Sequence, residues 1–174
     1  MQVVPDAHWL AVKRAVDIVG AVAGLVLFAP LMCRKVAVAK LTGNREIEIW
    51  GDGEQTRSFC YIDDCIEGIF RLMRSDYHQP LNLGQDRLIS INDLADLVAS
   101  VAGISIVKKH VPGPQGVRGR NSDNSRLRQV LRWEPTISLE QGLARTYAWI
   151  EQQVAGTLAG ATSSPASYAT KRAG

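Results

Sequence analysis

The sequence has few of the residues that build metal and redox centres. Three cysteines and three histidines are spread through 174 residues. Cys60 and Cys65 have no histidine paired with them, and their separation is not the ligand spacing of a zinc site. An odd number of cysteines in this pattern predicts buried or half-buried reduced thiols in a cytosolic protein. We therefore assign no residue to a metal and no histidine to catalysis.

Strong charge is lacking as well. The net charge is +3, and the lysines and arginines are scattered rather than gathered in a stripe. This distribution does not favour a nucleic-acid partner, whereas a polyanionic small ligand such as a nucleotide diphosphate fits it. Hydrophobic residues make up 46% and charged residues 21% of the chain, which is ordinary for one folded domain with a core.

The sequence has no visible internal repeat and no long run of alternating βαβ units. Short strand-like segments lie among helix-like segments, which predicts an α/β fold without a complete doubly wound sheet. The expected strands are residues 47–50, 58–62, 80–84 and 104–111. The expected helices are residues 33–40, 65–74, 93–102, 124–131 and 138–154. Residues 155–174 are small and polar, which predicts a disordered tail.

Capping residues precede two of the expected helices. Asp63 and Asp64 stand before the 65–74 helix, where carboxylates suit the positive end of the helix dipole. We interpret them as capping groups rather than as an acid or a base. Either Ser90 or Asn92 caps the following helix. The 65–74 helix also has an apolar face, which consists of Ile66, Ile69, Phe70 and Met73.

One long apolar run precedes these elements. Residues 15–32 are almost wholly apolar apart from Asp17, and they approach the length of about 20 residues that spans a bilayer. Asp17 and Pro30 count against a spanning helix. A signal peptide is not favoured, because the residues before Cys33 make a poor cleavage site.

This run has a resemblance of its own. The stretch from Lys13 to Met32, KRAVDIVGAVAGLVLFAPLM, resembles the opening membrane helix of bacterial polyprenyl-phosphate sugar-phosphate transferases. None of that family's catalytic segments follow it, so we interpret residues 1–32 as an apolar N-terminal helix fused to the rest of the chain. A membrane contact through residues 15–32 follows from this interpretation. A buried core helix, or a chance overlap at the Ala29-Pro30 pair, remains the alternative.

The stretch from Ile47 to Asp64, IEIWGDGEQTRSFCYIDD, joins a strand-like segment to a turn and a polar return. The glycines of residues 51–53 suit a tight turn with positive φ. Gln55, Thr56 and Arg57 then supply an amide, a hydroxyl and a forked cation. Spacing alone leaves two interpretations open, which are a hairpin with its polar residues in water and a ligand-binding turn.

A second stretch, from Val111 to Asn124, reads VPGPQGVRGRNSDN and has three glycines at a formal dinucleotide-loop spacing. Pro112, Pro114 and Arg118 obstruct the tight turn of such a loop, and no second βαβ unit follows. We interpret this stretch as a loop that presents Arg118 and Arg120 to an anion. A solvated basic loop is the alternative.

Together the two stretches resemble the extended short-chain dehydrogenase/reductases that act on nucleotide sugars, the NAD-dependent epimerase/dehydratase family. Within that family they are similar to a branch that epimerises a GDP-sugar. The resemblance covers Cys33 to about Gln153. It implies the C-terminal substrate-binding part of such an enzyme, lacking most of the Rossmann sheet. The predicted organisation is an apolar helix over 1–32, a nucleotide-sugar-binding domain over 33–154, and a tail over 155–174.

The resemblance also implies which residues bind the substrate. Cationic side chains suit the diphosphate of a GDP-sugar, and an amide suits sugar hydroxyls. The implied substrate-binding residues are Lys35, Gln55, Thr56, Arg57 and Arg120. In this family NAD oxidises the hexose at carbon 4, which makes carbons 3 and 5 acidic, and a cysteine and a lysine then exchange protons there.

The parts that carry this chemistry are expected upstream of Cys33. They are a glycine loop for NAD, a Tyr-x-x-x-Lys pair and a catalytic cysteine, and Phe28 stands where the proton-exchanging lysine is expected. The resemblance thus implies no catalytic residue and no cofactor site here, and a chain that is inactive without a cofactor-domain partner. Formation of a homodimer stays open. The alternatives are a membrane-anchored fragment and a non-functional fusion, and the expected location is cytoplasmic, with membrane association through the N-terminal helix.

Overall fold

The computed structural model describes residues 29–113, 117–119 and 121–162. Residues 1–28 of the expected N-terminal helix, the membrane contact predicted there and Arg120 therefore lie outside the described residues. Within the described part of the chain, no helix is long and apolar enough to cross a membrane.

A helix runs over residues 29–42 at the start of the described chain. Its buried residues include Cys33, Val36 and Ala37, which recur at the spacing of one helix face. Gly43 follows with a φ of 79°, a left-handed conformation that glycine adopts without strain. Met32 is only 7% exposed and belongs to the same core as Cys33. The helix therefore runs through the domain boundary that we expected at 32/33.

Two strands form the centre of the sheet. β1 (Glu46–Trp50) pairs in parallel with β4 (Val107–Val111), and α3 (Ile91–Ala102) precedes β4 in the chain. Ile47 and Ile49 are each 2% exposed and alternate with exposed neighbours, as a strand with one covered face requires. A second pair joins β2 (Thr56–Arg57) to β3 (Ile89–Ser90) in antiparallel orientation. The predicted α/β class with a partial sheet is confirmed.

The hairpin interpretation of the 47–64 stretch is wrong. β1 takes β4 as its partner, and the chain turns away through Gly51 and Gly53, which both have a φ of 73°. The return then pairs with β3 rather than with β1. The strand expected at 58–62 is absent, because α2 (Ile62–Met73) already begins there. Residues 80–84 likewise form no strand.

The core lies where α3, the 29–42 helix and α5 (Leu139–Thr162) meet over β1. Ser90 caps α3, because its hydroxyl accepts a hydrogen bond from the backbone N–H of Asp93 at 3.0 Å. Gly103 ends α3 in the left-handed conformation, as the sequence predicted. The fully buried side chains are the largest contributors to this core, and they are Cys33, Val36, Ile49, Leu94 and Val98, with Leu127 near α4.

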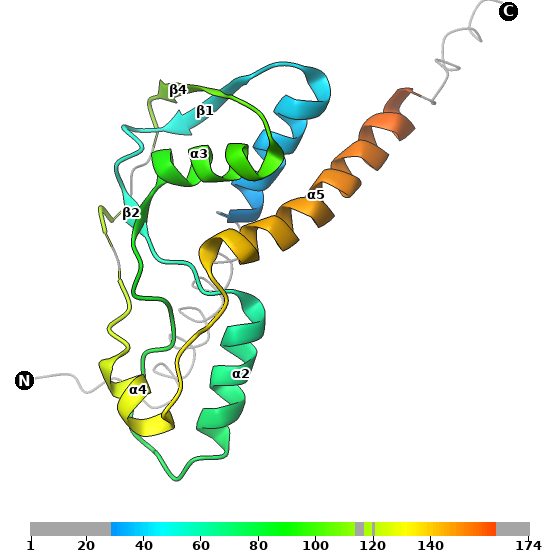
Figure 1. Cartoon of the computed structure of the whole chain (residues 1–174). Helices are drawn as coiled ribbons and strands as arrows, with labels where there is room; N and C mark the ends of the chain where they lie inside the picture. Colours follow the sequence, from blue (N-terminus) through cyan, green and yellow to red (C-terminus); the bar gives the residue numbers. More distant parts are fainter. Residues whose placement is uncertain (1–28, 114–116, 120, 163–174) are drawn as a thin grey trace, which may run out of the picture.

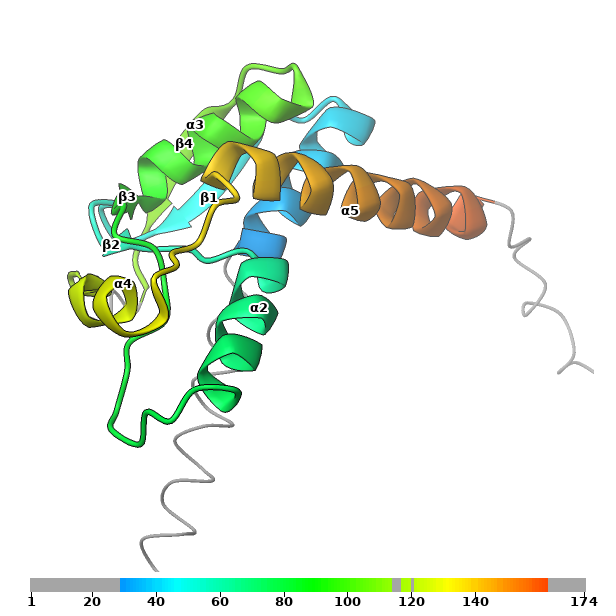
Figure 2. The same cartoon turned by 60° about the horizontal axis from the view of Figure 1, so that its bottom comes forward.

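α5 is longer than the sequence predicted. It was expected to end near Val154, but it continues to Thr162, so residues 155–162 of the predicted tail are helical. Figures 1 and 2 show α5 extending past the other elements. The remainder of the predicted tail, residues 163–174, lies outside the described residues.

α2 and α4 (Ser125–Leu131) lie at the end of the molecule away from the β1–β4 pair (Figures 1 and 2). Asp64 lies in the first turn of α2 and is not the cap, which is Tyr61. The Asp64 carboxylate is buried and accepts a hydrogen bond from the backbone N–H of Ile137 at 2.8 Å. The expected cap is thus a cross-link between α2 and the chain that leads into α5.

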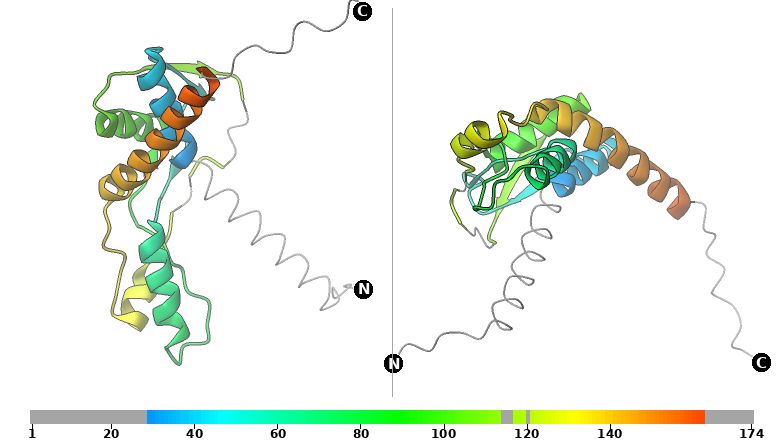
Figure 3. Two further views of the ribbon diagram at one scale, coloured as in Figure 1. Left: turned by 90° about the vertical axis from the view of Figure 1, so that its right-hand side faces the viewer. Right: turned by 90° about the horizontal axis from the view of Figure 1, so that it is seen from below.

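The apolar face of α2 is exposed. Figure 3 shows α2 projecting from the body of the molecule. Met73 is 78% exposed and Ile62 is 58% exposed. The opposite side of the helix is the one that packs inward, through Asp64 and Gly68. The exposed apolar residues of α2 are Ile62, Ile66, Ile69, Phe70 and Met73, which we call the α2 face.

Candidate functional site

The two stretches singled out in the sequence meet in space. The backbone N–H of Thr56 donates to the carbonyl of Arg118 at 2.8 Å. Thr56 and Gly119 also form a parallel β-bridge. The turn after β1 and the segment after β4 therefore lie side by side, and Figure 1 shows this region beyond the carboxyl ends of β1 and β4. Ligands of α/β proteins often bind at that edge of a parallel sheet.

Gln55 is buried in this region, with an exposed fraction of 7%. Its side-chain Nε2 donates to the carbonyl of Trp50 at 3.2 Å. Its Oε1 is buried and has no hydrogen-bond partner among the described residues. A buried acceptor without a donor costs about 1–3 kcal/mol, so this oxygen is suited to a donor supplied by a ligand.

Lys35 reaches the same strand from the 29–42 helix. Its ammonium donates to the carbonyl of Glu48 at 2.6 Å. The carbonyls of Glu48 and Trp50 point to the edge of β1 that β4 does not use, since Gly51 and Arg45 make the backbone bonds to β4. Residues two apart on a strand are about 6–7 Å from each other, so Lys35 and Gln55 bind neighbouring positions of one edge.

The arginines of the region differ in what holds them. Arg57 is half-buried, and its Nη1 donates to the carbonyl of Thr56 at 2.7 Å. Arg118 is 68% exposed at its side chain and pairs with the Asp52 carboxylate at 2.9 Å. Neither guanidinium uses all five of its donors in these contacts.

Trp50 is a residue of this region that the sequence analysis treated only as the end of a strand. It is 53% exposed, which is unusual for so large an aromatic side chain. Gly113 lies against it, because a Cβ added to Gly113 would come within 2.9 Å of the indole Cγ. The signal in the sequence was an outward strand position at the entrance to a glycine turn.

The glycines after β4 do not fit a dinucleotide-binding loop. Such a loop leads from a strand directly into a helix whose N-terminus faces the pyrophosphate. Here Gly119 bridges to Thr56, and the next described helix begins only at Ser125. Within the described residues there is also no group of three His, Cys, Asp or Glu side chains that could hold a metal ion.

The thiols are poor nucleophiles at neutral pH. Burial, with the nearby Cys65 and Asp64, raises the pKa of Cys60 to about 12. Burial raises the pKa of Cys33 to about 11. The thiolate is the reactive form of cysteine, so both groups are protonated and unreactive near pH 7.

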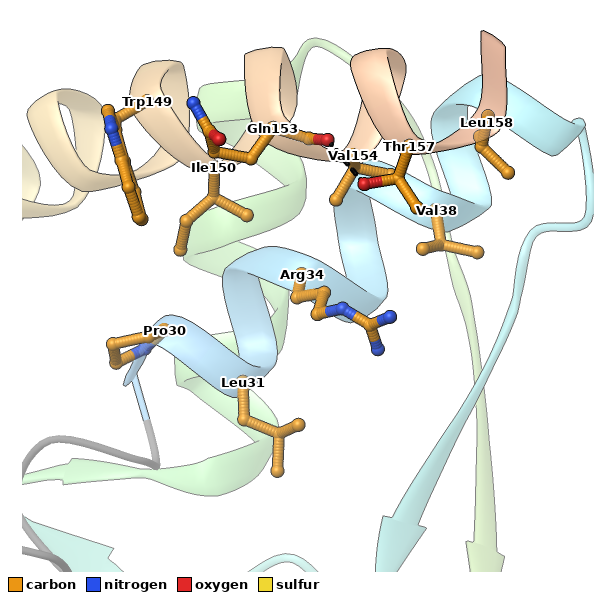
Figure 4. Close-up of a pocket in the computed structure, with 10 residues that line it drawn as sticks. All are labelled: Pro30, Leu31, Arg34, Val38, Trp149, Ile150, Gln153, Val154, Thr157 and Leu158. Carbon is orange, nitrogen blue, oxygen red and sulfur yellow. Dashed lines mark hydrogen bonds between the residues drawn. The ribbon is translucent and has the colours of Figure 1, made fainter. Parts of the chain in front are cut away.

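A separate apolar groove lies between the 29–42 helix and α5, with a volume of about 350 Å³ (Figure 4). Leu31 and Trp149 line it from the two helices, and they are 44% and 63% exposed. None of the predicted substrate residues lines this groove. Its size therefore does not make it the candidate site.

Comparisons with known proteins agree with the geometry. The profile of the NAD dependent epimerase/dehydratase family matches residues 26–84. The chain is 46% identical over 122 residues to GDP-mannose 3,5-epimerase 1 of Oryza sativa subsp. indica, and equally identical to GDP-mannose 3,5-epimerase of Arabidopsis thaliana. These matches cover 70% of this chain but only 31% of each relative, so the chain spans about a third of the length of the curated relatives.

Solved structures give the same result for the fold. UDP-glucose 4-epimerase from Thermotoga maritima, with UDP-glucose, superposes with a TM-score of 0.62 at 29% identity, over 68% of this chain and 38% of that one. A mutant UDP-glucuronic acid 4-epimerase from Bacillus cereus, in complex with a fluorinated UDP-sugar and NAD, gives 0.61 at 30% identity, over 69% and 39%. By its sequence motifs, its relatives and its fold, this chain belongs to the NAD dependent epimerase/dehydratase family.

Proposed function

We propose that this chain carries the GDP-sugar-binding part of a GDP-mannose 3,5-epimerase-like protein. The observation that carries the proposal is the buried, unpartnered Oε1 of Gln55 beside two arginine-bearing segments. This oxygen would accept a hydrogen bond from a sugar hydroxyl. Arg57 and Arg118 would supply charge-assisted hydrogen bonds to the diphosphate.

Lys35 and Arg120 complete the proposed substrate-binding set. Lys35 has two ammonium hydrogens beyond the one given to Glu48, so it can hold the strand and an anion at once. Arg120 lies outside the described residues, and its role rests on the sequence resemblance alone. Thr56 is tied to Arg118 through its backbone, which leaves its hydroxyl for a ligand or for the backbone near Gly119.

Trp50 is the proposed platform for the nucleotide base. Its indole is half exposed next to the arginine-bearing segments, and an aromatic face stacks favourably on a base. Stacking does not distinguish one base strongly from another. Selectivity for guanine over uracil is therefore a separate expectation, and it rests on the relationship to the GDP-mannose enzymes.

The chain is proposed to be inactive without a further polypeptide that supplies NAD. It spans 31% of the GDP-mannose epimerases that it resembles, and its glycine run does not fit a dinucleotide loop. The α2 face is the surface on which such a partner would dock, because five large apolar side chains are exposed there on one helix.

Calorimetric titration of the full chain with GDP, GDP-mannose and UDP-glucose tests the binding proposal. We expect the GDP compounds to bind more tightly than UDP-glucose, and Arg57→Ala and Arg120→Ala to weaken binding by about tenfold or more. Arg126→Ala is the matched control, since Arg126 lies on α4 away from the turn. Absence of any GDP binding would overturn the proposal.

Turnover is tested separately. The purified chain, mixed with GDP-mannose and NAD, is expected to release no epimer. Product formed by the chain alone would contradict the proposed dependence on a cofactor-bearing partner, while leaving the binding proposal intact.

A further inference from the structure

Asn92, in the first turn of α3, makes more contacts with the glycine turn than any predicted site residue does. Its Nδ2 donates to the carbonyl of Asp52 at 3.0 Å and to the Glu54 carboxylate at 2.8 Å. Its backbone N–H donates to the carbonyl of Gly53 at 3.0 Å. One residue of α3 thus binds three consecutive residues of the turn that leads into Gln55.

The orientation of the Asn92 amide is fixed from its other side. His110, on β4, lies with Nε2 at 2.9 Å from Asn92 Oδ1. An amide oxygen has no hydrogen to donate, so Nε2 carries the hydrogen of this bond. With the amide reversed, its oxygen would face the carbonyl of Asp52 and the carboxylate of Glu54, which is repulsive.

Packing between Asn92 and the turn leaves no spare room. A Cβ added to Gly53 would overlap the Asn92 side-chain amide. Gly53 also has a φ of 73°, a conformation that other residues adopt only with strain. The turn and the Asn92 side chain therefore fit each other in one arrangement only.

We propose that Asn92, supported by His110, is the positioning residue of the nucleotide-sugar site. By holding residues 52–54 it places Gln55 and Thr56 against Arg118 and Gly119, where the buried Gln55 oxygen and the arginines converge. This inference rests on the proposed function for its ligand, but the placement of Thr56 can be measured without a ligand. The sequence analysis had considered Asn92 only as a helix cap, a role that Ser90 fills.

The test compares Asn92→Ala with Ser90→Ala in the full chain. Both residues support the start of α3, but Ser90 bonds only to Asp93 and makes no side-chain contact with the 52–54 turn. Loss of the Ser90 cap costs about 1 kcal/mol, so Ser90→Ala reports what destabilisation alone does. The two measurements are the GDP dissociation constant and the hydrogen-exchange rate of the Thr56 amide, which bonds to the Arg118 carbonyl.

We expect Asn92→Ala to weaken GDP binding by about tenfold and to speed Thr56 exchange, while Ser90→Ala changes neither beyond its loss of stability. His110→Leu should give part of the same effect, and His110→Gln, which keeps a donor toward Oδ1, should restore it. Equal effects of Asn92→Ala and Ser90→Ala, or unchanged Thr56 exchange in Asn92→Ala, would overturn the inference. If the unaltered chain binds no GDP, the proposed function fails, and the exchange data still decide whether Asn92 positions the turn.

Discussion

The carboxylate of Asp52 holds the guanidinium of Arg118, with 2.9 Å between Oδ2 and Nη1. Asp52 belongs to the glycine turn, and Arg118 belongs to the segment after β4. Both side chains are more than a third exposed, so the pair contributes little to the free energy of unfolding. Its importance lies in binding, because a diphosphate at this place would compete with Asp52 for the same guanidinium.

Asp52→Asn is therefore expected to raise the affinity for GDP several-fold. The substituted amide keeps an oxygen at the Oδ1 position, which accepts from the backbone N–H of Glu54 at 3.0 Å, so the turn survives. Only the competing charge is removed. Calorimetric titration measures the change, and Asp96→Asn, which breaks the remote pair with Lys108, is the control. An unchanged or weakened affinity in Asp52→Asn would show that Arg118 does not meet the diphosphate.

Asp64 and Asp63 offer a matched test of the cross-link at the start of α2. Asp64→Ala leaves the buried N–H of Ile137 without its acceptor, which should cost about 1–3 kcal/mol in the free energy of unfolding. Asp63 is exposed and lies 3.4 Å from Arg145, so Asp63→Ala should cost less than about 1 kcal/mol. Urea denaturation followed by circular dichroism compares them. Equal losses for the two variants would contradict the distinct role of Asp64.

The α2 face should make the isolated chain associate with itself or bind hydrophobic dyes. Replacing Ile66 and Met73 together by glutamine should lower dye fluorescence and light scattering without lowering the unfolding midpoint, because both side chains are more than half exposed. Ile49→Gln, at a position that is 2% exposed, should unfold the protein and serves as the contrast. A marked loss of stability in the double variant would mean that the α2 face is packed within the chain.

Stability should fall in alkaline solution. The pKa of Cys33 rises to about 11 through burial, and burial with the Glu151 hydrogen bond raises the pKa of Tyr147 above its ordinary range. A raised pKa means that the folded state holds its proton more tightly than the unfolded state does. The stabilisation from Cys33 is thus complete below the unfolded thiol pKa, near 8.5, and is lost as pH rises toward 11.

Denaturant unfolding at a series of pH values from 8 to about 10.5 measures this fall. Cys33→Ala should lower stability at every pH, because it leaves a cavity in the core, but it should make the alkaline fall shallower. An alkaline slope that is the same in both proteins would exclude Cys33 as its source.

Local features of this fold were predictable from the sequence, and pairings between distant segments were not. Periodicity and a serine cap located α3, and the glycines of residues 51–53 announced the positive-φ turn. The partner of β1 was not predictable, because β4 lies some sixty residues away in the chain and nothing near β1 specifies it. The apolar run before Asp63 looked like a strand for the same reason, since the burial of Asp64 depends on Ile137, 73 residues further on.

The candidate site divides in the same way. The residue types in the turn, an amide followed by a hydroxyl and an arginine, suggested a ligand without excluding a solvated hairpin. Only the structure shows that Thr56 meets Arg118 and that the Gln55 oxygen lacks a donor. Asn92 escaped notice because its sequence position suits a helix cap, and its contacts with the turn cross 38 and 40 residues of chain.

The contacts of Lys35 and Gln55 with the free edge of β1 have a consequence for aggregation. An unpaired strand edge attracts strands from other molecules, and these two side chains occupy the carbonyls of Glu48 and Trp50 that such a strand would use. Removing either side chain would uncover an adhesive backbone as well as a binding group. Variants at Lys35 and Gln55 should therefore form intermolecular β-structure on storage sooner than Arg57 variants do, whatever each contributes to the ligand.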